Sequence, residues 1–233
     1  MKNISRRKFT AYTCFFAALF VGGIFAAPRL YAKKTPLRPP GALEEREFLA
    51  TCIKCGQCVQ VCPYHSLSMF DITQLNSIGT PYIDARKRGC YLCDLFPCVL
   101  ACPTGSLRHD ITSAADVSMG VAFVKDMQSC LTYKKQRVAS EDLAQILKHS
   151  NKNDREAQTL ERVGGYIGEE CSICANMCPY PQREQAIVMF ESSEGAVLPK
   201  IESKCVGCGV CAELCPSGVI SVIPRKNYEE IYR

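Results

Sequence analysis

The chain has no tryptophan and only three histidines, and it lacks the patterns that mark many enzymes. It contains no G-x-G-x-x-G after a strand-like run, no P-loop and no nucleophile elbow. His65, His109 and His149 are scattered along the sequence and are interpreted as surface or loop residues. We therefore expect no catalytic residues and no small-molecule substrate, and the chain is predicted not to be an enzyme.

Acidic residues are absent from residues 1–32, where the basic residues are Lys2, Arg6, Arg7, Lys8 and Arg29. Of the 28 Lys and Arg residues, the other 23 balance the 23 Asp and Glu residues of the chain. The basic pI of about 8.4 therefore reports mainly this leading segment. It gives no reason to expect a nucleic-acid partner.

The N-terminus has the layout of an export signal. Arg6-Arg7 precede an uncharged run from Ala11 to Ala27, which is short for a membrane-spanning helix and contains Gly22-Gly23. The arginine pair predicts the Tat export machinery as a partner and the periplasm as the destination. The signal is either cleaved or kept as an uncleaved anchor in the inner membrane.

Cysteine is the abundant exception, with 17 in the chain. Cys14 lies in the leader and is set aside. The others form four groups that each end in Cys-Pro, at residues 52–62, 90–102, 171–178 and 205–215. This is a fourfold internal repeat, and the long gap before the third group suggests two halves.

The first and last groups follow the bacterial ferredoxin pattern C-x2-C-x2-C-x3-C-P. Three closely spaced cysteines turn toward one cluster, and Gly56, Gly207 and Gly209 let the loop approach the sulfides. The fourth cysteine begins a helix and points to the other cluster of the pair. The second group is the same pattern with two extra residues between its second and third cysteines.

Exchange of the fourth cysteine predicts four ligand sets for four [4Fe–4S] clusters. The first set is Cys52, Cys55, Cys58 and Cys102, and the second set is Cys62, Cys90, Cys93 and Cys98. The third set is Cys178, Cys205, Cys208 and Cys211, and the fourth set is Cys130, Cys171, Cys174 and Cys215.

Cys130 enters the fourth set because four clusters need sixteen thiolates and it is the one cysteine outside the leader that is otherwise unassigned. The alternative is a free buried cysteine beside a [3Fe–4S] or water-ligated cluster. Zinc is disfavoured because zinc sites use paired C-x2-C units, and disulfides are disfavoured because a Tat substrate folds before export.

The predicted fold class is α+β, a loop-rich pair of tandem bacterial-ferredoxin-like di-cluster modules with small sheets and short helices. We expect short strands near 66–70, 121–124, 186–190 and 219–223, and a helix within 43–51. Residues 1–32 are the signal, 33–42 a Pro-rich linker, 43–125 the first module and 126–233 the second module.

The second module includes a charged insertion at 134–170. Ser140 is expected to cap a helix with Leu143, Ile146 and Leu147 on one face. The insertion as a whole is interpreted as a solvated excursion, with a partner-docking arm as the alternative.

The chain resembles the NapG/MauM family of periplasmic ferredoxin-type proteins. The resemblance rests on Leu37–Ala42, Glu45–Phe48, Gly79–Tyr82, the segment CYLCDLFPCVLACPTGSL at 90–107, and Met119–Ala122. One departure is that Cys130-Leu131 lies close before the third group in the family, whereas 40 residues separate Cys130 from Cys171 here.

The resemblance implies a relay of single electrons in the periplasm. Its expected partners are a membrane-bound quinol-oxidising iron–sulfur protein and a periplasmic reductase or cytochrome, in a nitrate reduction or amine oxidation system. Two other functions remain open at this point. One is the iron–sulfur subunit of a molybdopterin oxidoreductase, and the other is a maturation factor for the reductase.

Overall fold

The computed structural model describes residues 35–72, 77–148, 153–192 and 195–232. The chain divides into two compact units, Met1–Thr35 and Pro36–Arg233, and nearly all described residues belong to the second unit. The predicted signal with Arg6 and Arg7, Cys14 and His149 lie outside the described residues. Within the described ranges, no helix is both long enough and apolar enough to cross a membrane.

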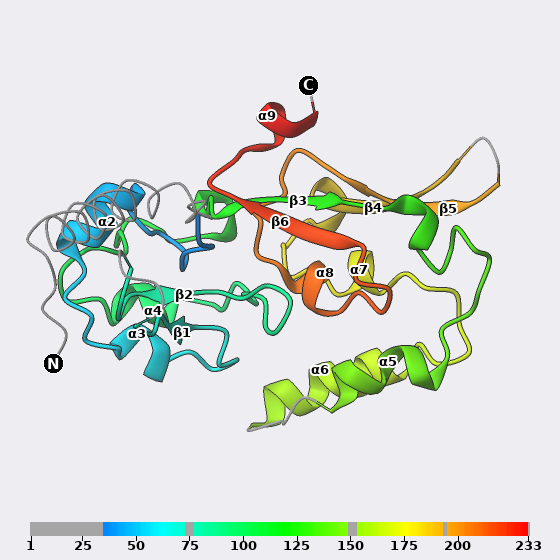
Figure 1. Ribbon diagram of the computed structural model, residues 1–233, viewed down its shortest axis with the longest axis horizontal. Helices are drawn as coiled ribbons and strands as arrows, with labels where there is room; N and C mark the ends of the chain where they lie inside the picture. The colour runs from blue at the N-terminus through cyan, green and yellow to red at the C-terminus, as the bar shows by residue number, and fades with distance from the viewer. Residues whose placement is uncertain (1–34, 73–76, 149–152, 193–194, 233) are drawn as a thin grey trace, which may run out of the picture. The chain divides into compact units, whose positions relative to one another are not determined.

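The strands pair into small antiparallel sheets of two strands each, as predicted. The pairs are β1 (Ser68–Met69) with β2 (Pro81–Tyr82), β3 (Gly120–Val124) with β6 (Ile220–Pro224), and β4 (Ile187–Glu191) with β5 (Val197–Ile201). Figure 1 shows β3 and β6 side by side, and α8 contacts β6 while α7 contacts β4.

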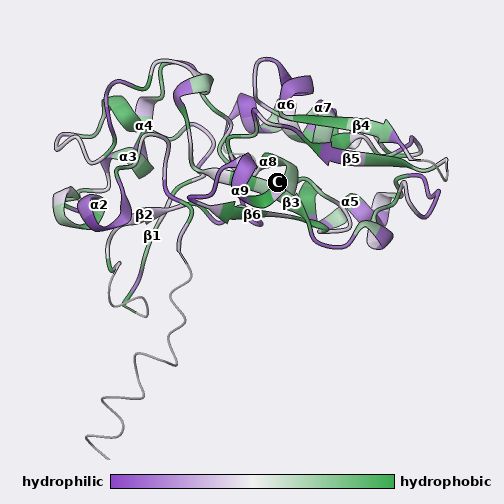
Figure 2. Cartoon of the chain, turned by 90° about the horizontal axis from the view of Figure 1, so that it is seen from above, coloured by the Kyte–Doolittle hydropathy of each residue, from purple (hydrophilic) through white to green (hydrophobic). Residues whose placement is uncertain are grey.

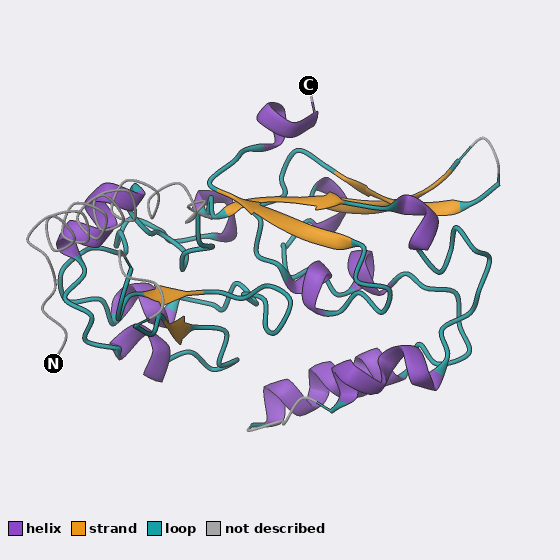
Figure 3. Cartoon of the chain, viewed as in Figure 1, coloured by secondary structure: helices purple, strands orange, loops and turns teal. Residues whose placement is uncertain are grey.

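Most helices are short, with seven residues or fewer, and four of them lie within the cysteine groups (Figure 3). They are α2 (Glu45–Thr51), α3 (Gln57–Gln60), α4 (Pro97–Leu100), α7 (Ile173–Asn176), α8 (Val210–Glu213) and α9 (Tyr228–Tyr232), with 3-10 turns at Ala114–Asp116, Met127–Ser129 and Arg183–Gln185. The helix expected within 43–51 is α2. The loop-rich mixture of short helices and small sheets confirms the predicted fold class.

Each half of the chain places its strand pairs at equivalent points of the cysteine pattern. In the second half, β4 and β5 join the third group to the fourth, and β3 and β6 flank the whole. In the first half, β1 and β2 join the two groups, and the outer pair is a single bridge between Ala42 and Leu107. Strand β3 thus pairs across the predicted boundary at residue 125, and the division of the chain at that residue stays a prediction.

The core is small and is built partly from the cysteines themselves. Phe48, Leu107 and Leu214 are at most 1% exposed and pack in one cluster with cysteines of both halves. In Figure 2, β4 and β6 are coloured hydrophobic along most of their length, whereas α9 is hydrophilic. Burial of these apolar side chains is the main driving force for such a fold, and helix propensity adds little in one-turn helices.

The charged insertion forms two helices, α5 (Ser140–Leu147) and α6 (Asp154–Gly164), which pack against each other. Their facing residues Leu143 and Val163 are fully buried. The two amphipathic helices bury one apolar face and leave the other exposed, so the interpretation of the insertion as a solvated excursion stays a prediction. The expected cap differs, because α5 begins at Ser140 with Ala139 at the N-cap, whose N–H donates to Asp142.

The two ends of the insertion are held together by backbone hydrogen bonds. The N–H of Val138 donates to the carbonyl of Glu169 over 2.9 Å, and the N–H of Gly168 donates to the carbonyl of Val138 over 2.8 Å. Arg137 bridges to Glu170 in the same ladder. The excursion therefore returns to its starting point, and Cys130 and Cys171 stay close despite the 40 residues between them.

Candidate metal centres

The first set of cysteines lines one hollow at the end of α2. Cys52 follows the last residue of α2, and Gly56, with a φ of +74°, turns the chain into α3, which carries Cys58. Burial raises the pKa of the Cys58 thiol to about 11, and the neighbouring Cys52, Cys55 and Cys102 act in the same direction. The four cysteines therefore line one hollow, with Cys58 and Cys102 buried and Cys55 at its exposed edge.

The second set lines another hollow, together with Pro40, Tyr91 and Phe96. The two residues that lengthen this group put Leu95 and Phe96 in the left-handed region, with φ of +61° and +41°. Pro97 then starts α4 and Cys98 lies within it. Burial, and after it the neighbouring Cys62 and Cys93, raise the pKa of the Cys98 thiol to about 12.

The third set lines a hollow between β3, the β4–β5 hairpin and α8. Cys211 lies in α8, whose N-cap is Gly209 with a φ of +86°. Burial raises the pKa of the Cys178 thiol to about 11, and Cys205 acts in the same direction. Burial and then Cys178 raise the pKa of Cys208 strongly.

The fourth set gathers three cysteines of the second half with Cys130. Burial raises the pKa of the Cys171 thiol to about 11, the N–H of Ile173 opposes this, and Cys130 and Cys215 add to the rise. Burial also raises the pKa of Cys174, with Cys171, Cys215 and Cys130 acting in the same direction. The structure thus places Cys130 beside the three cysteines with which the count had grouped it.

Hydrogen-bond donors surround several sulfurs. The N–H of Ser66 lies 3.3 Å from the sulfur of Cys62, and the N–H of Ala122 lies 3.4 Å from that of Cys205. Burial raises the pKa of the Cys102 thiol, but the Ser106 hydroxyl at 3.2 Å and the N–H groups of the loop lower it more, to about 7. Donors to sulfur stabilise the thiolate and tune a bound cluster.

The sequence analysis missed these donors, although a signal for some of them was present. A hydroxyl residue follows two positions after Cys102, Cys130 and Cys215. Thr132 lies 3.2 Å from the sulfur of Cys130, and Ser217 lies 3.7 Å from that of Cys215. A Cys-x-Ser/Thr pattern at a fourth or unassigned cysteine therefore indicates a hydroxyl that can donate a hydrogen bond to the ligand sulfur.

The two histidines among the described residues lie outside the four sets, as expected. His65 contacts Glu156, and a ring nitrogen of His109 lies 2.9 Å from the carbonyl oxygen of Cys102. Lys54 and Lys204, next to ligand candidates, are exposed.

The donor set fits cubane clusters better than single metal ions. All sixteen cysteines that the structure describes are unpaired thiols. Within the same described residues, no three His, Cys, Asp or Glu side chains converge closely enough to hold one ion. Four thiols around an apolar hollow match the all-cysteine ligation of a [4Fe–4S] cluster, whose four irons keep the sulfurs apart. Buried neutral thiols exchange their protons for metal on binding.

Within each half, the two sets are neighbours. The pKa of Cys98 in the second set is raised by burial and, among other groups, by Cys58 of the first set. The pKa of Cys211 in the third set is raised by burial and, among other groups, by Cys174 of the fourth set. Exchange of the fourth cysteine between groups produces this adjacency.

Comparisons with known proteins agree with this arrangement. The 4Fe–4S dicluster domain matches residues 51–106 and 169–219, one match in each half. No solved structure matches the chain.

Curated relatives cover most of the chain. The methylamine utilization ferredoxin-type protein MauM of Methylorubrum extorquens is 35% identical over 94% of this chain and 86% of its own length. The MauM protein of Paracoccus denitrificans is 37% identical over 81% of this chain and 71% of its own length. The ferredoxin-type protein NapG of Escherichia coli is 32% identical over 81% of this chain and 70% of its own length. The chain, with its two 4Fe–4S dicluster regions, therefore belongs to the MauM/NapG family of ferredoxin-type iron–sulfur electron-transfer proteins.

Proposed function

We propose that the protein relays single electrons in the periplasm through four [4Fe–4S] clusters, one held by each set of cysteines. The observation that carries the proposal is the grouping of sixteen thiols into four sets of four, three of them around distinct hollows. When bound, each cluster accepts and releases one electron. The chain holds the clusters, limits water around them and supplies hydrogen-bond donors to sulfur.

The proposed ligands are the four sets as defined above. Burial disfavours free thiolates in these hollows, so the sulfurs need the positive charge of iron to stay ionised. N–H and hydroxyl groups lie within hydrogen-bond distance of the sulfurs of Cys62, Cys102 and Cys205. A thiolate accepts such hydrogen bonds well, whereas a neutral thiol is a weak acceptor. Both features support metal ligation by these cysteines over a packing role.

The proposed location and partners rest on the sequence. Arg6-Arg7 support Tat export of a protein already loaded with clusters. The proposed donor is a membrane-bound quinol-oxidising iron–sulfur protein, and the proposed acceptor is a periplasmic reductase, such as nitrate reductase, or a cytochrome. The nitrate system rests on the family resemblance, and relatives named for methylamine utilization make an amine oxidation system the alternative setting.

Metal analysis of the anaerobically purified protein tests the four-cluster proposal. Four cubanes predict about 16 iron and about 16 sulfide per chain. Cys14→Ser is the matched control and should leave both counts unchanged, because Cys14 belongs to the leader. About eight iron atoms per chain, or zinc in place of iron, would refute the proposal. Reduction of all four clusters by a quinol-linked membrane fraction would then separate an electron carrier from a maturation factor.

A further inference from the structure

The two halves of the protein touch through residues of their cysteine loops. The N–H of Cys90, in the second set, donates to the carbonyl oxygen of Cys208, in the third set, over 2.8 Å. Both residues are buried. This hydrogen bond therefore joins the second set directly to the third set, and both of its partners are candidate ligand residues.

Gly89 makes this close approach possible. A Cβ atom at residue 89 would lie 2.4 Å from the nitrogen of Val210 and 2.6 Å from the carbonyl carbon of Gly209. Real Cβ atoms do not come so near to backbone, and the backbone at Val210 cannot move aside as a flexible side chain can. Only glycine therefore fits at position 89 while the Cys90–Cys208 hydrogen bond is kept.

Glu213 holds the contact from the other side. Its Oε2 accepts the N–H of Gly89 over 2.7 Å, and its Oε1 lies 3.5 Å from a guanidinium nitrogen of Arg88. The Glu213 side chain is buried, so its hydrogen bond to Gly89 is shielded from water. Glu213 lies in α8, the helix that also carries Cys211, so it ties segment 88–90 to the third set.

The loop of the third set is fixed on its opposite side as well. The N–H of Met119 donates to the carbonyl of Val206 over 3.1 Å, and a Cβ at Gly207 would lie 2.3 Å from the carbonyl carbon of Gly120. The loop is thus clamped between segment 85–90 and the start of β3. Its position relative to the second set is therefore defined by backbone packing.

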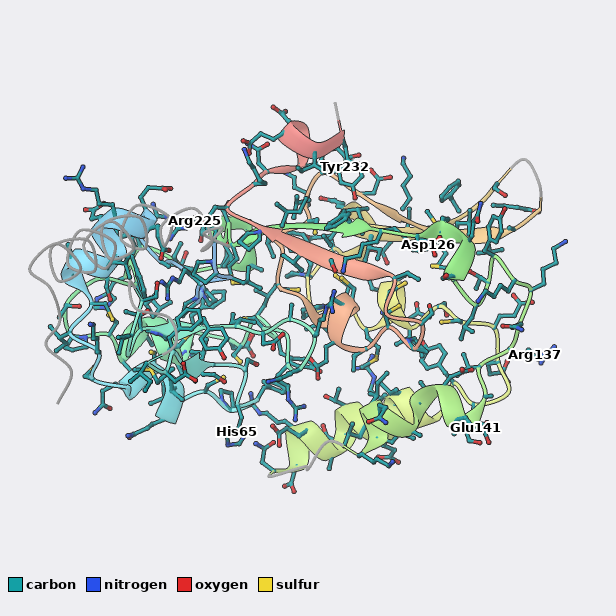
Figure 4. The ribbon with its side chains drawn as sticks, in the orientation of Figure 1. His65, Asp126, Arg137, Glu141, Arg225 and Tyr232 are labelled. Atoms are coloured by element: carbon teal, nitrogen blue, oxygen red, sulfur yellow. The ribbon has the colours of Figure 1, made fainter. Side chains whose placement is uncertain are left out.

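Two other hydrogen bonds between the halves, among the described residues, end on residues outside the four sets. Arg225, labelled in Figure 4, donates to the carbonyl of Leu43, and Asn153 donates to the carbonyl of Pro63. We propose that the Cys90–Cys208 contact is the crossing by which electrons pass between the two halves, with Gly89 and Glu213 as its positioning residues. At this crossing one electron leaves the second set and enters the third, or the reverse, and no bond or proton changes. The inference rests on the proposed function, because it requires a cluster in each of these sets.

The test compares Gly89→Ala with Gly164→Ala, where a new Cβ meets nothing within 4 Å. One reducing equivalent is injected rapidly into the anaerobic protein, and its redistribution among the clusters is followed by absorbance and freeze-quench EPR. We expect the fast redistribution between halves to be lost in G89A and kept in G164A. Iron content and midpoint potentials should be unchanged in both.

A second pair of variants decides the matter if G89A fails to assemble its clusters. Glu213→Gln keeps an oxygen that accepts the Gly89 N–H, whereas Glu213→Leu removes it, so redistribution should be preserved in E213Q and slowed in E213L. Fully loaded G89A that redistributes as fast as G164A would overturn the inference, and so would E213L behaving as E213Q does. An iron count near eight in the unsubstituted protein would instead overturn the proposed function, so the two failures are distinguishable.

Discussion

Replacement of Glu156 by alanine should loosen the α6 helix from the rest of the protein. The Glu156 side chain is fully buried, and its Oε1 lies 3.0 Å from Nδ1 of His65 and 3.7 Å from Nη2 of Arg88. At the same end of α6, Asn153 accepts the N–H of Glu156 and donates to the carbonyl of Pro63 over 2.6 Å. Glu156 is thus part of the attachment of the insertion to the second-set loop.

Removing one partner of a buried ion pair usually costs 3–5 kcal/mol, because the other charge is left uncompensated. Here the cost should be at the low end, about 3 kcal/mol, since Arg88 keeps Glu213 as a partner and His65 is 43% exposed and can be hydrated. At about 1.4 kcal/mol for each factor of ten, the local opening equilibrium of α6 should rise by about 100-fold.

Amide hydrogen exchange of α6 in the cluster-loaded protein measures this opening directly. Glu161→Ala is the matched control, because Glu161 is an exposed glutamate on the same helix. We expect α6 amides to exchange about 100-fold faster in E156A than in E161A. Equal exchange rates in the two variants would refute the claim that Glu156 anchors the insertion.

Three further predictions concern Cys130, the arginine pair of the leader and Arg225. Cys130→Ser should damage one cluster only, because a serine hydroxyl is a poorer ligand than thiolate, and it should produce a [3Fe–4S] EPR signal or a loss of roughly one to four iron atoms. Four intact cubanes in this variant would remove Cys130 from the fourth set. Arg6-Arg7→Lys-Lys should leave cluster-loaded protein in the cytoplasm, as fractionation would show, and an unchanged periplasmic yield would rule out the arginine pair as the export signal. Arg225→Ala should weaken the attachment of the residue after β6 to the start of α2 by about 1 kcal/mol, because it removes the hydrogen bonds that Nη2 donates to the carbonyl of Leu43 and to the carboxylate of Glu45. Amides of α2 that exchange as in the unsubstituted protein would contradict this.

The family, the fold class and the grouping of cysteines could be predicted from the sequence because the chemistry of each group is local. Spacings of two residues turn neighbouring thiols to one side of a loop. The expectation that the fourth cysteine begins a helix is wrong, because a one-turn helix ends just before the Cys-Pro of each group. The structure brings the first, second and third sets together as the ferredoxin pattern predicts. Within a group the cysteines lie a few residues apart, and the ferredoxin pattern itself assigns the fourth cysteine to the neighbouring set.

The tertiary structure decided what depends on residues far apart in the sequence. Cys130 returns to Cys171 because backbone bonds such as that between Val138 and Glu169 close the insertion, and loop closure of this kind leaves no local pattern. Glu156 is buried because its carboxylate meets His65 and Arg88, which lie far away in the sequence. In the sequence it is only one more charged residue of the insertion, and nothing local marks it as buried. In the same way, only packing distinguishes Gly89, which lies against the backbone of the other half, from glycines that meet nothing.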